Sequence, residues 1–152
     1  MVITLVAVLG TLAGSLVTGL LQHLTAVHTQ QTARAESRRQ AITDAVPALL
    51  KAVVEFRQAQ FLKIRAKLGG QDDTQDAVEK RYTARSCMTA AMDILFLATT
   101  DEALLAIAQE AVDAAIALGD VALDEVDVAR DRARRAHSAL RIAGARAVQA
   151  FR

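Results

Sequence analysis

The first 21 residues of the chain, Met1 to Leu21, contain no charged side chain. An α-helix rises about 1.5 Å per residue, so 20 residues span the hydrocarbon core of a bilayer, which is about 30 Å thick. A buried central helix of a soluble bundle is the alternative interpretation, but such helices are usually interrupted by a charge within about 10 to 14 residues. The segment therefore predicts a transmembrane anchor helix, placed over residues 1–28.

The residues around this apolar segment predict its fate and its orientation. A cleaved signal peptide would need basic residues before the apolar stretch, and this chain has no Lys or Arg before Arg34. Basic residues that follow a membrane segment closely favour the cytoplasmic side, and Arg34, Arg38 and Arg39 all do so. We therefore expect an uncleaved, single-pass protein of the bacterial inner membrane, with a short outer N-terminus and residues 22–152 in the cytoplasm.

The anchor has one helix face of small and hydroxyl-bearing residues and an opposite face of Leu and Val. The small-residue face consists of Thr4, Ala7, Gly10, Thr11, Gly14, Ser15 and Thr18. Small residues let two helix backbones approach closely, and Gly10-x-x-x-Gly14 is a known form of that contact. We expect this face to pack against another helix, most simply a second copy of the chain. Two alternatives stay open, namely the general abundance of Gly and Thr in membrane helices and a water-filled path lined by hydroxyls.

The rest of the chain predicts an all-α fold. Strong helix formers dominate it, and no run of β-branched or aromatic residues is bounded by turn residues. We expect a juxtamembrane helical connector over residues 29–43 and an antiparallel bundle of three or four helices over residues 44–152. Ala occupies most positions of the helix seams, and each buried methyl removes little surface from water. Burial between subunits would add stability, so this feature also predicts a homo-oligomer.

Capping and turn residues predict where the helices of the bundle begin and end. Asp44 as N-cap and Pro47 in a first turn predict a helix that restarts there and ends at Gly69-Gly70. Asp73 or Thr74 can cap the next helix.

Two later positions predict the remaining helix boundaries. Thr99-x-x-Glu102 has the form of a capping box and predicts the start of the third helix. Gly119-Asp120 is ambiguous, because the apolar series continues beyond it with heptad-like spacing. A break there gives a fourth helix, with Asp120 as its N-cap, and is the favoured interpretation. The alternative is one long, coiled-coil-like C-terminal helix.

Charge is distributed in blocks, although the net charge is only +1. Residues 30–85 carry 11 basic and 7 acidic side chains, residues 86–129 carry 9 acidic and no basic ones, and residues 130–152 carry 7 Arg and 1 Asp. One interpretation is that an acidic helix lies beside basic helices and that exposed ion pairs set the helix order.

The other interpretation is functional and concerns an arginine stripe on the last helix, which also contains His137. The stripe consists of Arg130, Arg134, Arg141 and Arg152. These side chains could bind anionic lipid, nucleic acid or an acidic partner protein. Nucleic acid is the least expected of these ligands, because no aromatic residues accompany the stripe. His137 is expected to be a solvated side chain.

Groups that could perform catalysis or hold a metal are sparse. His23 and His28 lie on different helix faces, and the lone Cys87 is expected in the core. Glu110-x-x-Asp113 lacks the Glu-x-x-His pairs that a di-metal bundle needs on neighbouring helices. No Gly-rich loop precedes a Lys-Ser or Lys-Thr pair, as phosphate-binding loops require. We therefore expect a non-enzymatic protein with no cofactor and no metal.

The segment VLGTLAGSL at residues 8–16, the segment QHLT at residues 22–25 and the Ala/Arg-rich helical remainder resemble small uncharacterised membrane-anchored proteins of actinobacteria. The resemblance implies a bacterial inner-membrane protein and assigns no functional residue. Phage spanins share this layout, but their tails face the periplasm, which the basic residues after the anchor argue against.

The leading hypothesis is a membrane-anchored scaffold protein that self-associates through the anchor and docks a protein partner through the bundle. An oligomeric pore or membrane-perturbing effector is the alternative, since the anchor's hydroxyls share one face. A third possibility is a module that binds anionic lipid or nucleic acid through the arginine stripe.

Overall fold

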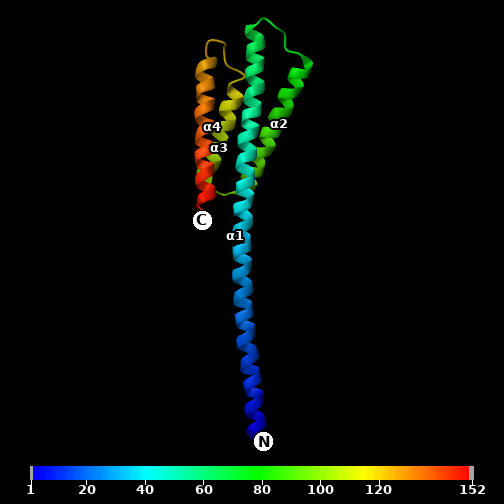
Figure 1. The fold of residues 1–152 in the computed structure, drawn as a ribbon, viewed down its shortest axis with the longest axis vertical. Coiled ribbons are helices and arrows are strands. Elements are labelled where there is room, and N and C mark those ends of the chain that lie inside the picture. Colours follow the sequence, from blue (N-terminus) through cyan, green and yellow to red (C-terminus); the bar gives the residue numbers. More distant parts are fainter. Residues whose placement is uncertain (1, 151–152) are drawn as a thin grey trace. The chain divides into compact units, whose positions relative to one another are not determined.

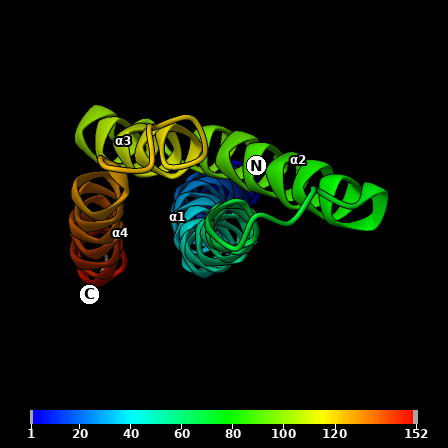
Figure 2. The same cartoon turned by 90° about the horizontal axis from the view of Figure 1, so that it is seen from above.

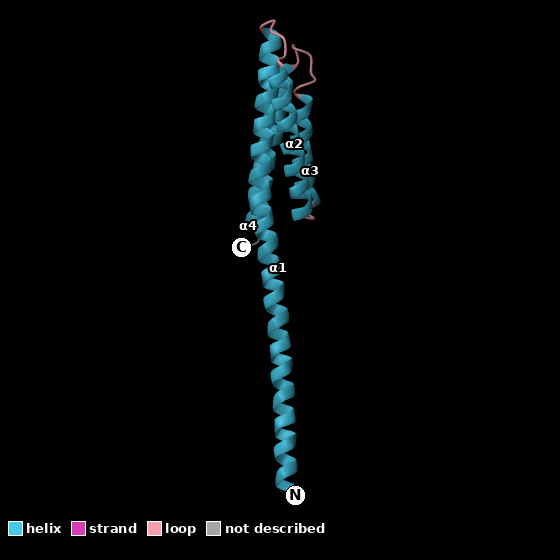
Figure 3. Ribbon diagram, turned by 90° about the vertical axis from the view of Figure 1, so that its right-hand side faces the viewer, coloured by secondary structure: helices cyan, strands magenta, loops and turns pink. Residues whose placement is uncertain are grey.

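A computed structural model describes the backbone of residues 2–150 and the side chains of residues 33–150. It contains four α-helices, α1 (Val2–Leu68), α2 (Gln75–Ala98), α3 (Glu102–Ala117) and α4 (Val126–Gln149) (Figure 1). The described backbone contains no strand, so the expected all-α fold class is confirmed (Figure 3). The chain divides into two compact units, Met1–Ser37 and Arg38–Arg152. The second unit contains the bundle and is described by itself.

Helix α1 passes through Pro47 without a break, so the predicted restart at Asp44 is wrong. Proline lacks a backbone N–H and crowds the preceding turn, which costs about 3 kcal/mol inside a helix. The helix continues because Pro47 is exposed while a stripe of neighbouring side chains is buried in the core. This stripe comprises Ile42, Ala45, Val46 and Leu49. The Asp44 carboxylate does not cap a helix, and accepts hydrogen bonds from Gln40 Nε2 at 3.0 and 3.2 Å.

The end of α1 at two glycines is confirmed. The N–H of Gln71 donates to the carbonyl of Ala66 at 2.9 Å, and the N–H of Gly70 donates to that of Lys67 at 3.2 Å. This is the Schellman pattern, in which the residue after the helix takes a left-handed conformation. Gly70 has φ 65°, a backbone conformation that is strained for a residue with a side chain.

The caps of α2 and α3 agree only partly with expectation. Thr74 is the N-cap of α2, as one of the two alternatives predicts. The N-cap of α3 is Asp101, whose carboxylate accepts the N–H groups of Ala103 at 3.0 Å and Leu104 at 3.1 Å. Thr99 ends α2 and its hydroxyl accepts the N–H of Asp101 at 3.1 Å. The predicted capping box is wrong because Asp101 serves two N–H donors at once.

Helix α3 ends at Ala117 and a separate helix α4 follows, which confirms a fourth helix in place of one long C-terminal helix. The expected N-cap at Asp120 is wrong, since α4 begins only after Glu125, which makes no side-chain capping bond. The turn after α3 lies against α1. The carbonyl of Gly119 accepts a hydrogen bond from Lys63 Nζ at 3.0 Å. A Cβ added at Gly119 would lie 2.4 Å from Gln60 Nε2.

All four helices contribute to one core. Its largest fully buried side chains are Phe56, Leu49, Met88, Leu95, Leu104, Leu140 and Val53. Within the bundle unit, α1 lies between α2 and α4, and α2 diverges from α1 toward its own N-terminal end (Figures 1 and 2). The buried residues of α2 are therefore confined to its C-terminal half, and Tyr82 in the N-terminal half is 68% exposed.

The packing of α4 on α1 is close at one glycine. Gly144 is buried, and a Cβ added there would lie 2.4 Å from Val46 Cγ1. The absence of a side chain at this position lets the two helices approach each other.

Among the residues whose side chains the structure describes, no helix is long and apolar enough to cross a membrane. The predicted anchor over residues 1–28 and its small-residue face lie outside the described side chains. Both therefore stay predictions.

Candidate functional site

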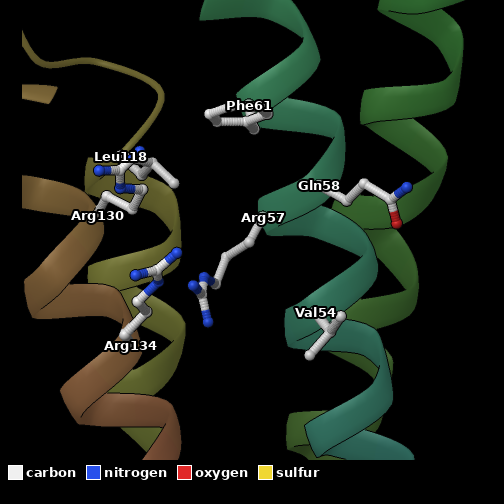
Figure 4. Close-up of a pocket in the computed structure, with 7 residues that line it drawn as sticks. All are labelled: Val54, Arg57, Gln58, Phe61, Leu118, Arg130 and Arg134. Atoms are coloured by element: carbon white, nitrogen blue, oxygen red, sulfur yellow. The ribbon is translucent and has the colours of Figure 1, made fainter. Parts of the chain in front are cut away.

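A cavity of about 310 Å³ lies between α1 and α4 in the bundle unit (Figure 4). Arg57 extends into it from α1, and Arg134 extends toward Arg57 from α4 (Figure 4). Arg130 lies one helical turn from Arg134, on the same wall of the cavity. The remaining lining is mainly apolar and comprises Val54, Gln58, Phe61 and Leu118.

Helical spacing brings these residues together. Val54, Arg57 and Phe61 are three and four residues apart on α1, and Arg130 and Arg134 are four apart on α4, so each set shares one helix face. The buried core beside them, which includes residues of both helices, holds the two faces toward each other.

Cationic side chains dominate the electrostatics of the cavity. The Nε atoms of Arg57 and Arg130 are both buried and lack a hydrogen-bond partner. Burial lowers the pKa of the Arg57 guanidinium, and the charge of Arg134 lowers it further. None of the described residues that line the cavity is acidic. The described lining therefore brings three cations together and contributes no carboxylate.

Two exposed carboxylates of α4 pair with the arginines of that helix. Arg130 pairs with Asp127 at 2.7 Å, and Arg134 approaches Asp131 at 4.0 Å. The side chains of Asp127 and Asp131 are 81% and 57% exposed. Such exposed pairs contribute about 0–1 kcal/mol each, so they hold Arg130 and Arg134 only weakly, and neither pair involves Arg57.

His137 adjoins this site and is not the solvated side chain that the sequence predicts. It is half-buried, and its Nδ1 atom is buried without a hydrogen-bond partner. Burial lowers its pKa most, and the charges of Arg57 and Arg141 lower it further. Nearby cations disfavour a protonated imidazole, so the pKa of His137 responds to the charge of the cavity.

The predicted arginine stripe is thus only partly assembled. Arg130 and Arg134 line the cavity, Arg141 is exposed further along α4 beyond His137, and Arg152 lies outside the described residues. The sequence interpretation missed Arg57, because it considered the stripe on a single helix. Its position could have been inferred from the spacing of the buried residues Val53, Phe56 and Gln60, which places residue 57 beside the buried face of α1.

The alternative explanation of the charge blocks also has support. Arg132 of α4 donates to Glu110 of α3 at 2.8 Å, which joins the basic and the acidic block. Both side chains are about half exposed, so this pair contributes only about 0–1 kcal/mol.

The described residues contain no group of three or more His, Cys, Asp or Glu side chains that could hold a metal ion. Glu110 is engaged by Arg132, and Asp113 accepts a hydrogen bond from Gln109 at 2.9 Å. Cys87 is exposed on α2, which corrects its expected place in the core.

The described fold and cavity define a four-helix protein with a cationic site between its first and last helices. The sequence model of the KilB plasmid transfer protein family matches residues 43–148. The chain belongs to this family.

Protein KilB of Streptomyces lividans is 41% identical over 92 residues, or 59% of this chain. The aligned region spans 60% of the length of that relative. No solved structure matches the chain. A relative from Streptomyces agrees with the resemblance to small actinobacterial proteins, while the membrane anchor in that resemblance precedes the residues matched by the family.

Proposed function

We propose that this chain is a membrane-anchored, non-enzymatic assembly protein that acts in plasmid transfer. The observation that carries the proposal is the family match over residues 43–148, which includes all of α2 and α3 and the described part of α4 up to residue 148. The family is described as the KilB plasmid transfer protein family, and the relative from Streptomyces lividans is named Protein KilB. The bundle is accordingly the part of the chain to which this role is assigned.

The membrane part of the proposal rests on the uncharged residues 1–21 and on the basic residues that follow them. A segment of this length and polarity is long enough to span the hydrocarbon core, and the basic residues favour a cytoplasmic bundle. The small-residue face of the anchor, with Gly10 and Gly14 at its centre, would join copies of the chain. The bundle would then dock a protein partner at the membrane.

Cys87 allows a direct test of this topology, because it is the chain's single cysteine and is exposed. A membrane-impermeant maleimide should label it only after the membrane of intact cells is permeabilised. Labelling of intact cells would place the bundle on the outer side and contradict the predicted orientation. Release of the chain from membranes by alkaline carbonate would contradict the anchor.

Self-association is tested by crosslinking in native membranes. The full chain should give a ladder of oligomers that weakens in a Gly10→Leu, Gly14→Leu double variant, because larger side chains hold the helix backbones apart. Ala13→Leu enlarges a residue outside the small-residue face and is the matched control. Plasmid transfer frequency from donor cells that carry each variant should fall with the loss of the ladder.

Two outcomes would overturn the assembly role. A strictly monomeric crosslinking pattern would remove self-association, and an unchanged transfer frequency in cells that lack the chain would remove the role in transfer. Conductance by the purified chain in planar bilayers would instead support the pore that the hydroxyls of the anchor raise as an alternative.

A further inference from the structure

We propose that the cavity between α1 and α4 is a binding site for a phosphate monoester group, held by Arg57, Arg130 and Arg134. The proposal concerns the bundle alone and does not depend on the anchor or on the role in plasmid transfer. It rests on the convergence of three guanidinium groups, on the unpartnered buried Nε atoms of Arg57 and Arg130, and on the apolar walls around them.

The charge of the cavity calls for an anion. Arg57 makes no ion pair with any described residue, and the carboxylates near Arg130 and Arg134 face solvent. Like charges at short range in a partly desolvated site repel one another, and folding alone does not relieve this repulsion. A bound anion would relieve it at all three side chains.

The hydrogen-bonding needs of the cavity agree with its charge. Buried donors without partners cost free energy, and the Nε atoms of Arg57 and Arg130 are two such donors. Guanidinium groups donate in a planar fork that matches the oxygens of carboxylate and phosphate groups. An oxyanion in the cavity would provide acceptors to both helices at once.

A phosphate monoester fits three arginines better than a carboxylate or a phosphodiester does. A monoester carries a charge of about −1.5 to −2 at neutral pH and has three strong acceptor oxygens. A carboxylate offers one charge and two oxygens, and a phosphate in a nucleic-acid backbone also carries only one charge. Three cations that approach from two helices are best matched by the dianion.

The walls of the cavity indicate that the phosphate is attached to an apolar group. Val54, Phe61 and Leu118 line it, and Phe61 is 41% exposed, so its ring can contact a ligand from solvent. A volume of about 310 Å³ lies at the lower end of the range of small-molecule sites. A nucleoside monophosphate combines a monoester with a flat base, and phosphatidic acid combines one with acyl chains.

Binding is tested by titration calorimetry on the full chain in nanodiscs of neutral lipid. Inorganic phosphate and adenosine 5′-monophosphate should bind, and acetate at the same ionic strength should bind at least tenfold more weakly. If the soluble phosphates do not bind, but phosphatidic acid in the nanodisc binds and this binding requires the same arginines, the source of the monoester is lipid. Absence of binding by all three phosphate probes would overturn the proposal.

Arginine variants assign the binding to this cavity. Arg57→Gln and Arg134→Gln should each weaken phosphate binding by tenfold or more, while Arg135→Gln should leave it within twofold. Arg135 is exposed on α4 next to Arg134 and does not line the cavity, so its variant matches the loss of charge. Equal losses in all three variants would mean a diffuse charge effect and would overturn the proposal.

Two further readouts exclude a merely structural effect. Because Arg57 is repelled by its neighbours, Arg57→Gln without ligand should unfold at the same temperature as the parent chain or a higher one, and should lose the stabilisation by phosphate. In NMR titrations, phosphate should raise the pKa of His137, since the anion offsets the charge of Arg57. Salt-dependent binding of duplex DNA that needs Arg57, without binding of monoesters, would overturn the proposal in favour of nucleic acid.

Discussion

The close approach of α1 and α4 at Gly144 predicts a substitution whose effect opposes helix propensity. In an open helix, Gly→Ala stabilises by about 0.5–1 kcal/mol. At Gly144 the new Cβ would lie 2.4 Å from Val46 Cγ1, and an overpacked contact of this kind costs about 1–3 kcal/mol. We expect Gly144→Ala to lower the free energy of unfolding by about 1 kcal/mol. For a domain of this size the Tm should fall by about 4 °C.

A double-mutant cycle isolates this contact. Val46→Ala removes two buried methyl groups and should cost about 1.5 kcal/mol by itself. It also removes the atoms nearest to the new Cβ and leaves the Val46 Cβ position at 3.4 Å, which is an ordinary contact. Gly144→Ala should then gain its helix propensity in this background. The resulting coupling free energy is about 1.5–2 kcal/mol.

The assay is urea denaturation of the full chain in detergent, followed by circular dichroism at 222 nm. Gly69→Ala is the control, because the added Cβ would lie no closer than 3.5 Å to a carbonyl oxygen and Gly69 has no positive φ. It should change stability by less than about 0.5 kcal/mol. If Gly144→Ala stabilised the chain equally with Val46 and with Ala at position 46, the inferred helix contact would be refuted.

Three other predictions follow from the fold. Pro47→Ala should raise the free energy of unfolding by about 2 kcal/mol in the same urea assay, because Pro47 lies exposed inside a helix, where proline is unfavourable; a loss of stability would contradict this. Asp101→Ala should lower it by about 1 kcal/mol while Asp101→Asn retains most of the cap, and equal losses would argue against the capping bonds. As the pH falls below about 7, the unfolded chain should protonate His137 near pH 6.5 while the folded chain resists, so stability should decrease until the pH passes the lowered pKa. Stability measured against pH should lose this component in His137→Asn, and an unchanged profile would contradict the assignment.

Local sequence signals predicted helix ends well where a single residue decides the geometry. Gly70 takes the left-handed conformation that a Schellman ending requires, and Thr74 caps the following helix. Local sequence signals gave wrong predictions where tertiary packing outweighs a local preference. The restart at Asp44 did not occur, because burial on both sides of Pro47 compensates for the lost backbone hydrogen bond.

The candidate site was only half predictable for a related reason. Arg130 and Arg134 share a helix face, so their spacing alone brings them together. Arg57 lies far from them in the sequence, and only the packing of α1 on α4 joins it to them. The burial of His137 had no local signal either, since it depends on the same packing. Membership of the KilB plasmid transfer protein family comes from the family match alone, because composition and helix periodicity do not encode it.

The divergence of α2 from α1 divides the bundle into regions of unequal local stability. Met88, Ala91 and Leu95 secure the C-terminal half of α2 in the core, whereas a cavity of about 240 Å³ separates the N-terminal half from α1. The ion pair of Lys80 with Asp76, at 2.7 Å, joins this half only to itself. Amide hydrogens at the start of α2 should therefore exchange with solvent by local opening, long before those of the core helices exchange by global unfolding.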